Sequence, residues 1–139
     1  MANLTRFGVS IENSMLEKFD ALIRKKKYTN RSKAIGDMIR NMIVEEEWEK
    51  GDGESIGTIN IVYDHHKKGL SSVLNRIQHD YHSLIVSDTH VHLDHDNCLD
   101  VIIVRGKIRI IKLIADKLTS ARGVKFGRLT VATKGKDLK

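Results

Sequence analysis

The sequence has 139 residues, of which 40% are hydrophobic, and this length suits one ordinary domain or two small ones. A formal net charge of +6 favours an anionic partner such as nucleic acid. The single cysteine excludes a disulfide within the chain. No apolar run is long enough to span a bilayer, and the opening residues lack a signal-peptide pattern, so we expect a cytoplasmic protein.

Charge and histidine are distributed unevenly along the chain. Residues 1–44 hold nine Lys/Arg and four Asp/Glu, whereas the next eleven residues, EEEWEKGDGES, hold six acidic residues and one lysine. All seven histidines follow, between His65 and His95. This pattern predicts a basic domain, an acidic linker and a histidine-bearing domain. These segments cover residues 1–48, 49–56 and 57–139.

The basic domain begins with alternating apolar residues over residues 6–11, which predicts a short strand. Two helices are expected to follow. The run SMLE from Ser14 has the spacing of a capping box, with Asn13 as a competing cap, and predicts a first helix that ends at about Lys27. Asn30 is a suitable N-cap for the second helix, which carries an apolar stripe of its own.

A lone strand with two helices leaves a sheet edge unpaired, so we expect two copies to pair their strands into an antiparallel ribbon. A β-ribbon fits the DNA major groove, where arginine reads guanine and serine contacts several bases. The outward face would carry Arg6, Gly8 and Ser10, and the second helix would point its N-terminus, with Arg31 and Ser32, at a phosphate. The element order and the run YTNRSKAI resemble the ribbon-helix-helix class of DNA-binding domains. The alternative is a basic dimerisation hairpin.

The histidine-bearing domain shows patterns for strand, helix, strand, strand, helix and strand. This order describes a ferredoxin-like βαββαβ sandwich, so the chain as a whole is expected to be α+β. The second helix is expected to close at Gly123. The expected strands cover residues 56–66, 83–93, 98–106 and 124–133, and the helices cover residues 68–82 and 107–123.

His90 and His92 lie two positions apart on an expected strand, so their imidazoles leave the same face. The turn DHDN brings Cys98 back beside His92. Imidazole and thiolate suit nickel, copper or zinc rather than calcium or magnesium, so the pattern favours a metal site over ordinary structural side chains. A cysteine hydrolase is the rival interpretation, but no nucleophile signature is present, and we do not expect an enzyme. His79 lies at the end of the preceding helix and is not expected to reach the hairpin of its own chain, so a neighbouring chain could supply it.

The run QHDYH...HVHLDHDNCLDVIIVRG, with RGVKFG beyond it, resembles the NikR family of nickel-responsive repressors over nearly the whole chain. This resemblance implies a homotetramer, a dimer of dimers with an ACT-like core, that binds palindromic operator DNA and controls nickel uptake. It also implies one square-planar Ni²⁺ per chain, held by His90, His92 and Cys98 with His79 from another chain. Copper is the expected competitor in vitro. Asp100 shares the strand face of Cys98 and is expected to support a ligand histidine.

Two positions depart from the family pattern. Gly8 stands where the family commonly has threonine, so one base contact per strand is expected to be missing. Lys33 and Asp37 stand where an acidic pair helps to hold a cation between domains. The Lys33 ammonium could replace that cation, but we favour an ordinary i, i+4 surface pair.

The remaining basic groups and histidines of the second domain have weaker assignments. His65 and His66 are interpreted as surface groups, with a weak accessory metal site as the alternative. Lys67, Lys68 and Arg122 lie at element ends and could touch phosphates. A metal-independent ribbon-helix-helix repressor, either antitoxin-like or responsive to a small molecule, is the alternative function.

Overall fold

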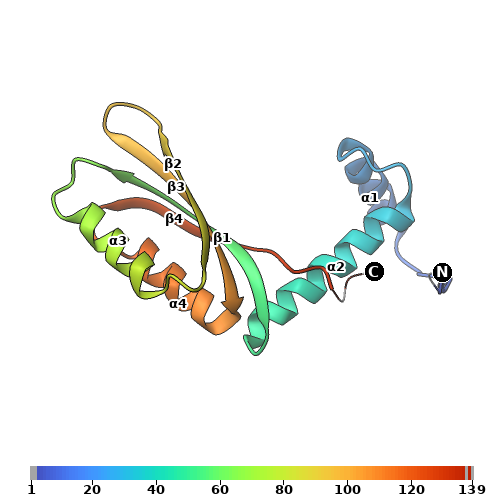
Figure 1. Cartoon of the computed structure of the whole chain (residues 1–139). Helices are drawn as coiled ribbons and strands as arrows, with labels where there is room; N and C mark the ends of the chain where they lie inside the picture. Colours follow the sequence, from blue (N-terminus) through green and yellow to red (C-terminus); the bar gives the residue numbers. More distant parts are fainter. Residues whose placement is uncertain (1–2, 137, 139) are drawn as a thin grey trace. The chain divides into compact units, whose positions relative to one another are not determined.

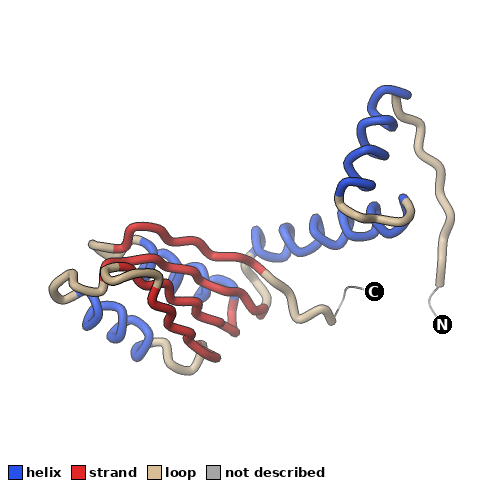
Figure 2. The backbone as a smooth tube through the Cα atoms, turned by 90° about the horizontal axis from the view of Figure 1, so that it is seen from above, coloured by secondary structure: helices blue, strands red, loops and turns tan. Residues whose placement is uncertain are grey.

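The computed structural model describes residues 3–136 and residue 138 of the chain. The chain divides into two compact units (Figures 1 and 2). The residues up to Ile43, with those from Gly135 onward, form the first unit, and Val44–Lys134 form the second. Among the described helices, none combines the length and hydropathy that crossing a membrane requires.

The first unit is built from an N-terminal segment and two helices, α1 (Asn13–Lys25) and α2 (Arg31–Lys50), the second of which continues into the other unit. The expected cap of α2 is confirmed, because Asn30 Oδ1 accepts a hydrogen bond from the backbone N–H of Lys33 at 2.8 Å. The predicted capping box of α1 is wrong. The helix starts at Asn13, so its N-cap is Glu12, two residues before Ser14, and the Glu12 side chain makes no cap hydrogen bond.

Residues 3–12 form no strand in the single chain, in contrast to the expectation from their alternating pattern. A strand needs a hydrogen-bonding neighbour, and the expected neighbour is the same segment of a second copy. The apolar side chains of this segment are consequently exposed, with Phe7 at 66% and Val9 at 65%. Helix α1 likewise has no fully buried side chain. The first unit therefore presents apolar surface that a partner would cover.

The second unit is an antiparallel sheet with two helices on one face (Figure 2). Its strands lie in the order β2-β3-β1-β4. This arrangement confirms the expected βαββαβ sandwich and the α+β class. The elements are β1 (Glu54–Asp64), α3 (Leu70–Asp80), β2 (Ile85–His92), β3 (Asn97–Lys107), α4 (Ile108–Thr119) and β4 (Val124–Val131).

The core of the second unit lies between the sheet and its helices. Alternate residues of β1 are buried, and Ile59 and Ile61 are fully so. They face the apolar stripe of α4, which contains Ile108, Ile111, Ile114, Ala115 and Leu118. Gly127 of β4 lets α4 approach closely, because a Cβ at this position would lie 2.5 Å from the Thr119 side chain. This packing supports β1 and β3, which contribute side chains to the site described below.

Trp48, in the last turn of α2, belongs to this same core. It is only 3% exposed, and its Nε1–H donates a hydrogen bond to the carbonyl oxygen of Ala132 at 2.8 Å. The division between the two units therefore falls inside α2. Where the sequence predicts a linker over residues 49–56, the structure has residues 51–53 alone between α2 and β1.

Candidate metal centre

The β2–β3 hairpin places the predicted ligands beside one another. In the register of the two strands, His92 lies opposite Cys98 and His90 lies opposite Asp100. The turn between them is held by Asp94, whose Oδ1 accepts hydrogen bonds from the backbone N–H groups of Asp96 and Asn97, each at 2.8 Å. Hydrogen bonds from Asn97 and Asp96 hold the pKa of Asp94 at about 2. The expected tight turn is thus present and keeps the two strands in register.

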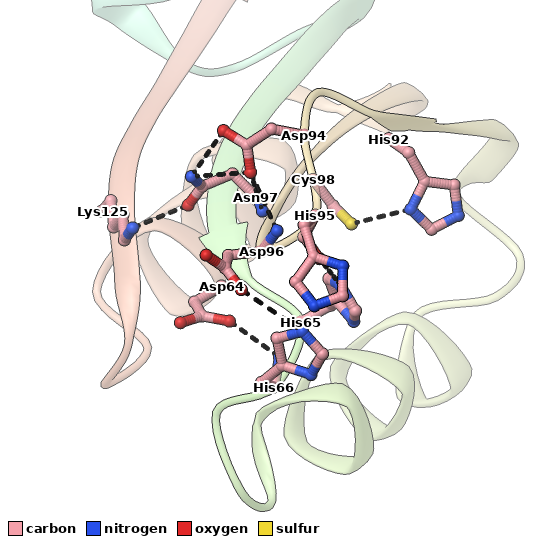
Figure 3. A network of polar contacts seen from close by, with 10 residues as sticks. All are labelled: Asp64, His65, His66, His92, Asp94, His95, Asp96, Asn97, Cys98 and Lys125. Atoms are coloured by element: carbon pink, nitrogen blue, oxygen red, sulfur yellow. Dashed lines mark hydrogen bonds and ion pairs between the residues drawn. The ribbon is translucent and has the colours of Figure 1, made fainter.

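Cys98 is fully buried, and its Sγ lies 3.5 Å from Nδ1 of His92 (Figure 3). Burial raises the pKa of the Cys98 thiol, and the carboxylates of Asp100, Asp94 and Asp64 raise it further. The thiol must therefore lose a proton when a metal ion binds, since thiolate is the ligand form. A soft sulfur and an imidazole nitrogen already stand close enough to share one metal ion.

His90 is oriented by the buried carboxylate of Asp100. His90 Nδ1 lies 2.5 Å from Asp100 Oδ1, and the Tyr63 hydroxyl donates a hydrogen bond to Asp100 Oδ2 at 3.1 Å. Burial and the Asp100 charge raise the pKa of Tyr63, so this hydroxyl keeps its proton. Because Nδ1 faces Asp100, Nε2 of His90 is the atom available to a metal. Tyr63 was missed from the sequence, although it follows Ile59 and Ile61 on the inward face of β1.

His79 lies apart from these three residues in the single chain. It sits near the end of α3, exposed to solvent, and its ring stacks on that of His82 with centroids 6.0 Å apart. Instead, His65 lies beside the hairpin side chains, although the sequence predicts that it is a surface group. His65 is partly buried, and its ligand atom lies within 4.8 Å of those of His92 and Cys98. One chain thus gathers three donors without His79.

The residues expected to contact DNA lie in the first unit. Arg6, Gly8 and Ser10 are exposed in the N-terminal segment, and Ser32 is exposed at the start of α2. Arg31 makes a bidentate ion pair with Asp20 of α1, at 2.9 and 2.8 Å, so it would have to release Asp20 before it could bind a phosphate. In the second unit, Lys67, Lys68 and Arg122 are also exposed.

The Lys33–Asp37 pair is present and is part of a larger group. Lys33 Nζ lies 2.6 Å from Asp37 Oδ1, and Arg40 lies 3.0 Å from the same oxygen. The Tyr28 hydroxyl donates a hydrogen bond to the other oxygen at 2.7 Å. Hydrogen bonds from Lys33 and Tyr28 lower the pKa of Asp37. Both oxygens of this carboxylate therefore already have partners within their own unit.

On this sheet, a buried thiol beside converging imidazoles forms a set of nitrogen and sulfur donors of the kind found in proteins that bind transition metals. The profile of the NikR C-terminal nickel-binding domain matches residues 56–132. The chain therefore belongs to the NikR family of nickel-responsive regulators. It is a DNA-binding transcription regulator and not an enzyme, and its metal is Ni²⁺.

Individual relatives extend this similarity to the whole chain. One relative, from Solibacter usitatus (strain Ellin6076), is named as a nickel-responsive regulator. It is 50% identical over 139 residues, which is all of both chains. One from Desulfovibrio desulfuricans (strain ATCC 27774 / DSM 6949 / MB), named in the same way, is 53% identical over 138 residues, or 99% of each chain. A solved structure, of an uncharacterized protein from Thermotoga maritima, matches 58% of this chain and 100% of its own with a TM-score of 0.53. At 12% identity, that last match supports the fold alone.

Proposed function

We propose that this protein is a homotetrameric repressor, a dimer of dimers, that binds a palindromic operator in the cytoplasm when loaded with nickel and controls nickel uptake. The observation that carries the proposal is the hairpin site: Cys98 Sγ lies 3.5 Å from His92 Nδ1, and the neighbouring His90 is oriented by Asp100. A buried thiol beside two imidazoles, one of which is oriented by a carboxylate, is a donor set that suits a transition metal ion.

The proposed nickel ligands are His90, His92 and Cys98, with His79 of the partner subunit. Three nitrogen donors and one sulfur suit the tetragonal coordination of Ni²⁺, whereas zinc prefers a tetrahedron. His79 is exposed on α3 and is free of the hairpin of its own chain, which suits a role across a subunit interface. Bound nickel would supply a link between chains. It can favour the DNA-binding arrangement only by as much as it binds that arrangement more tightly.

The assembly is supported by apolar surface in both units. In the second unit, the sheet face opposite the helices carries Val91, which is 40% exposed, and Phe126, which is 49% exposed. In the first unit, α2 exposes Met38 and Met42 at 56% and 68%. Exposed apolar residues on both units fit one contact between DNA-binding units and another between sheets. Two contacts of this kind are what a dimer of dimers requires.

The function is tested by selecting operator DNA from a random pool with full-length protein, and then measuring its affinity with and without one equivalent of NiCl₂ per chain. Nickel is expected to tighten binding by about 5- to 150-fold, the usual range of coupling between two sites. Sedimentation of the same samples checks the tetramer. Equal affinity with and without nickel would instead support a metal-independent repressor.

Arg6→Ala tests the proposed DNA-reading segment. If Arg6 reads a base edge from the ribbon, its loss is expected to weaken operator binding by roughly 1 to 3 kcal/mol per contact and to reduce discrimination against scrambled DNA. Lys18→Ala, which removes an exposed charge from α1, is the matched control. Both affinities are measured at one salt concentration. An equal loss on operator and scrambled DNA would make Arg6 a phosphate contact.

Asp100→Asn tests the support of the ligand histidine. The substitution keeps the shape of the side chain but removes the charge that orients His90, so nickel affinity is expected to fall by about 10- to 100-fold. Affinity is measured by competition with a chelator. Tyr63→Phe, which removes one of the hydrogen bonds to Asp100 and keeps the carboxylate, is expected to cost less. Unchanged affinity in Asp100→Asn would remove this residue from the site.

A further inference from the structure

A second group of metal-binding side chains lies beside the proposed nickel site and shares none of its residues. The ligand atoms of His66, His95 and Asp96 all lie within 4.8 Å of one another, and all three residues are exposed (Figure 3). His66 Nε2 lies 3.4 Å from Asp96 Oδ1, and the rings of His66 and His95 have centroids 5.3 Å apart. We call this group the loop triad.

The backbone around the loop triad is held in place by other contacts. His66 follows the end of β1, whereas His95 and Asp96 lie in the β2–β3 turn. The two loops are joined by the backbone of His65, whose N–H donates a hydrogen bond to the carbonyl oxygen of Asp96 at 3.0 Å. The His65 ring adds a contact of 2.6 Å between its Nε2 and the carbonyl oxygen of His95. The two loops thus stay together without the triad side chains.

The spacing of the loop triad suits a metal ion. Ligand atoms about 2.1 Å from an ion lie at most about 4.2 Å apart, so small side-chain rotations would bring all three donors onto one ion. Two imidazoles and one carboxylate suit nickel, copper or zinc, and the exposure of the site leaves its other coordination positions to water. An ion pair between His66 and Asp96 is the simpler account, but it leaves the nearby His95 ring without a role.

We propose that His66, His95 and Asp96 form a second binding site for a divalent transition metal ion. The ion would tie the end of β1 to the turn that precedes Cys98. With three protein ligands, no thiolate and an open solvent side, this site is expected to bind metal more weakly than the hairpin site and to exchange it faster. The loop triad shares no residue with the proposed nickel ligands, but its test rests on one part of the proposed function, because the thiolate band of Cys98 marks the first equivalent.

The test titrates NiCl₂ into the untagged, full-length protein, with calorimetry and absorbance recorded together. The first equivalent per chain is expected to develop the thiolate-to-nickel absorption band. A second equivalent is expected to bind without any growth of that band. In His66→Asn/His95→Asn, the second equivalent should weaken by more than about 100-fold while the band is unchanged. This is because loss of even a hydrogen-bond partner of a ligand costs about 10- to 100-fold, and two ligands are removed here.

His82→Asn is the matched control, because it removes an exposed histidine that lies outside the loop triad and the proposed nickel ligands. Both equivalents should bind to it as to the unmodified protein. Asp96→Asn should weaken the second equivalent alone. The proposal is overturned if the unmodified protein binds a single equivalent, or if the second equivalent binds His66→Asn/His95→Asn unchanged. Loss of the thiolate band in that variant would also overturn it, because the histidines would then belong to the first site.

Discussion

His79→Ala and Cys98→Ala are each expected to abolish tight nickel binding, and refolding the two variants together is expected to restore part of it. If each site takes three ligands from one chain and His79 from the partner, a mixed pair contains one complete site. The His79→Ala chain contributes His90, His92 and Cys98, and the Cys98→Ala chain contributes His79. The other site of the pair lacks both ligands. A site completed within one chain cannot be rescued, because neither variant holds a full ligand set.

The readout is bound nickel and the intensity of the thiolate-to-nickel band in mixed and in separately refolded samples. Formation of mixed tetramers is verified first, by native mass spectrometry. A His82→Ala chain, refolded alone, should keep its nickel, because His82 is not among the proposed ligands. If verified mixed tetramers recover no nickel, the cross-chain site is excluded. The fourth ligand would then be sought within the chain, beginning with His65, which already lies beside His92 and Cys98.

Trp48→Ala is expected to lower the free energy of unfolding by about 3 to 5 kcal/mol, the usual cost of deleting a buried aromatic side chain. Trp48 is 3% exposed and packs in the core of the second unit, although it is carried by the helix that begins in the first. The measurement is urea unfolding of the metal-free protein at one fixed concentration, because assembly makes stability depend on concentration.

Trp48→Phe separates packing from hydrogen bonding in the same experiment. It keeps an aromatic ring in the core and removes the Nε1–H that donates a hydrogen bond to Ala132. Ser55 Oγ also donates to that carbonyl oxygen, at 3.2 Å, so the acceptor keeps one partner. The cost is expected to be about 1 kcal/mol from the lost hydrogen bond, plus that of the smaller ring. A loss below about 1 kcal/mol in Trp48→Ala would show that the end of α2 is not part of the core.

The strands and helices of the second unit could be predicted because their burial follows simple periods. In β1 alternate residues around Ile59 are buried, and in α4 Ile111 and Ile114 recur at helical spacing, so both sequence patterns match the observed inward faces. The hairpin followed from the turn residues after His92. The same periodicity could not show that residues 6–11 form no strand in the single chain, because a strand depends on a hydrogen-bonding neighbour and not on its pattern alone.

The missed residues depend on contacts between distant parts of the sequence. Trp48 stands in an acidic run that resembles a linker, and its core position depends on Ala132. His65 is separated by more than twenty residues from His92 and Cys98, and only strand register brings them together. In each case a signal was present, since a lone tryptophan in a polar run and a histidine pair at a strand end are both unusual. Neither signal identifies its partner.

The complete burial of Cys98 also bears on oxidation. Peroxide and disulfide reagents react with exposed thiolates, and this side chain is neither exposed nor easily ionised, because burial raises its pKa. Chains that meet in an assembly therefore cannot cross-link through their lone thiols while they stay folded. The sulfur should react with a thiol reagent only as fast as the hairpin opens. The thiol is thus expected to be protected during oxidative stress and to remain intact as a metal ligand.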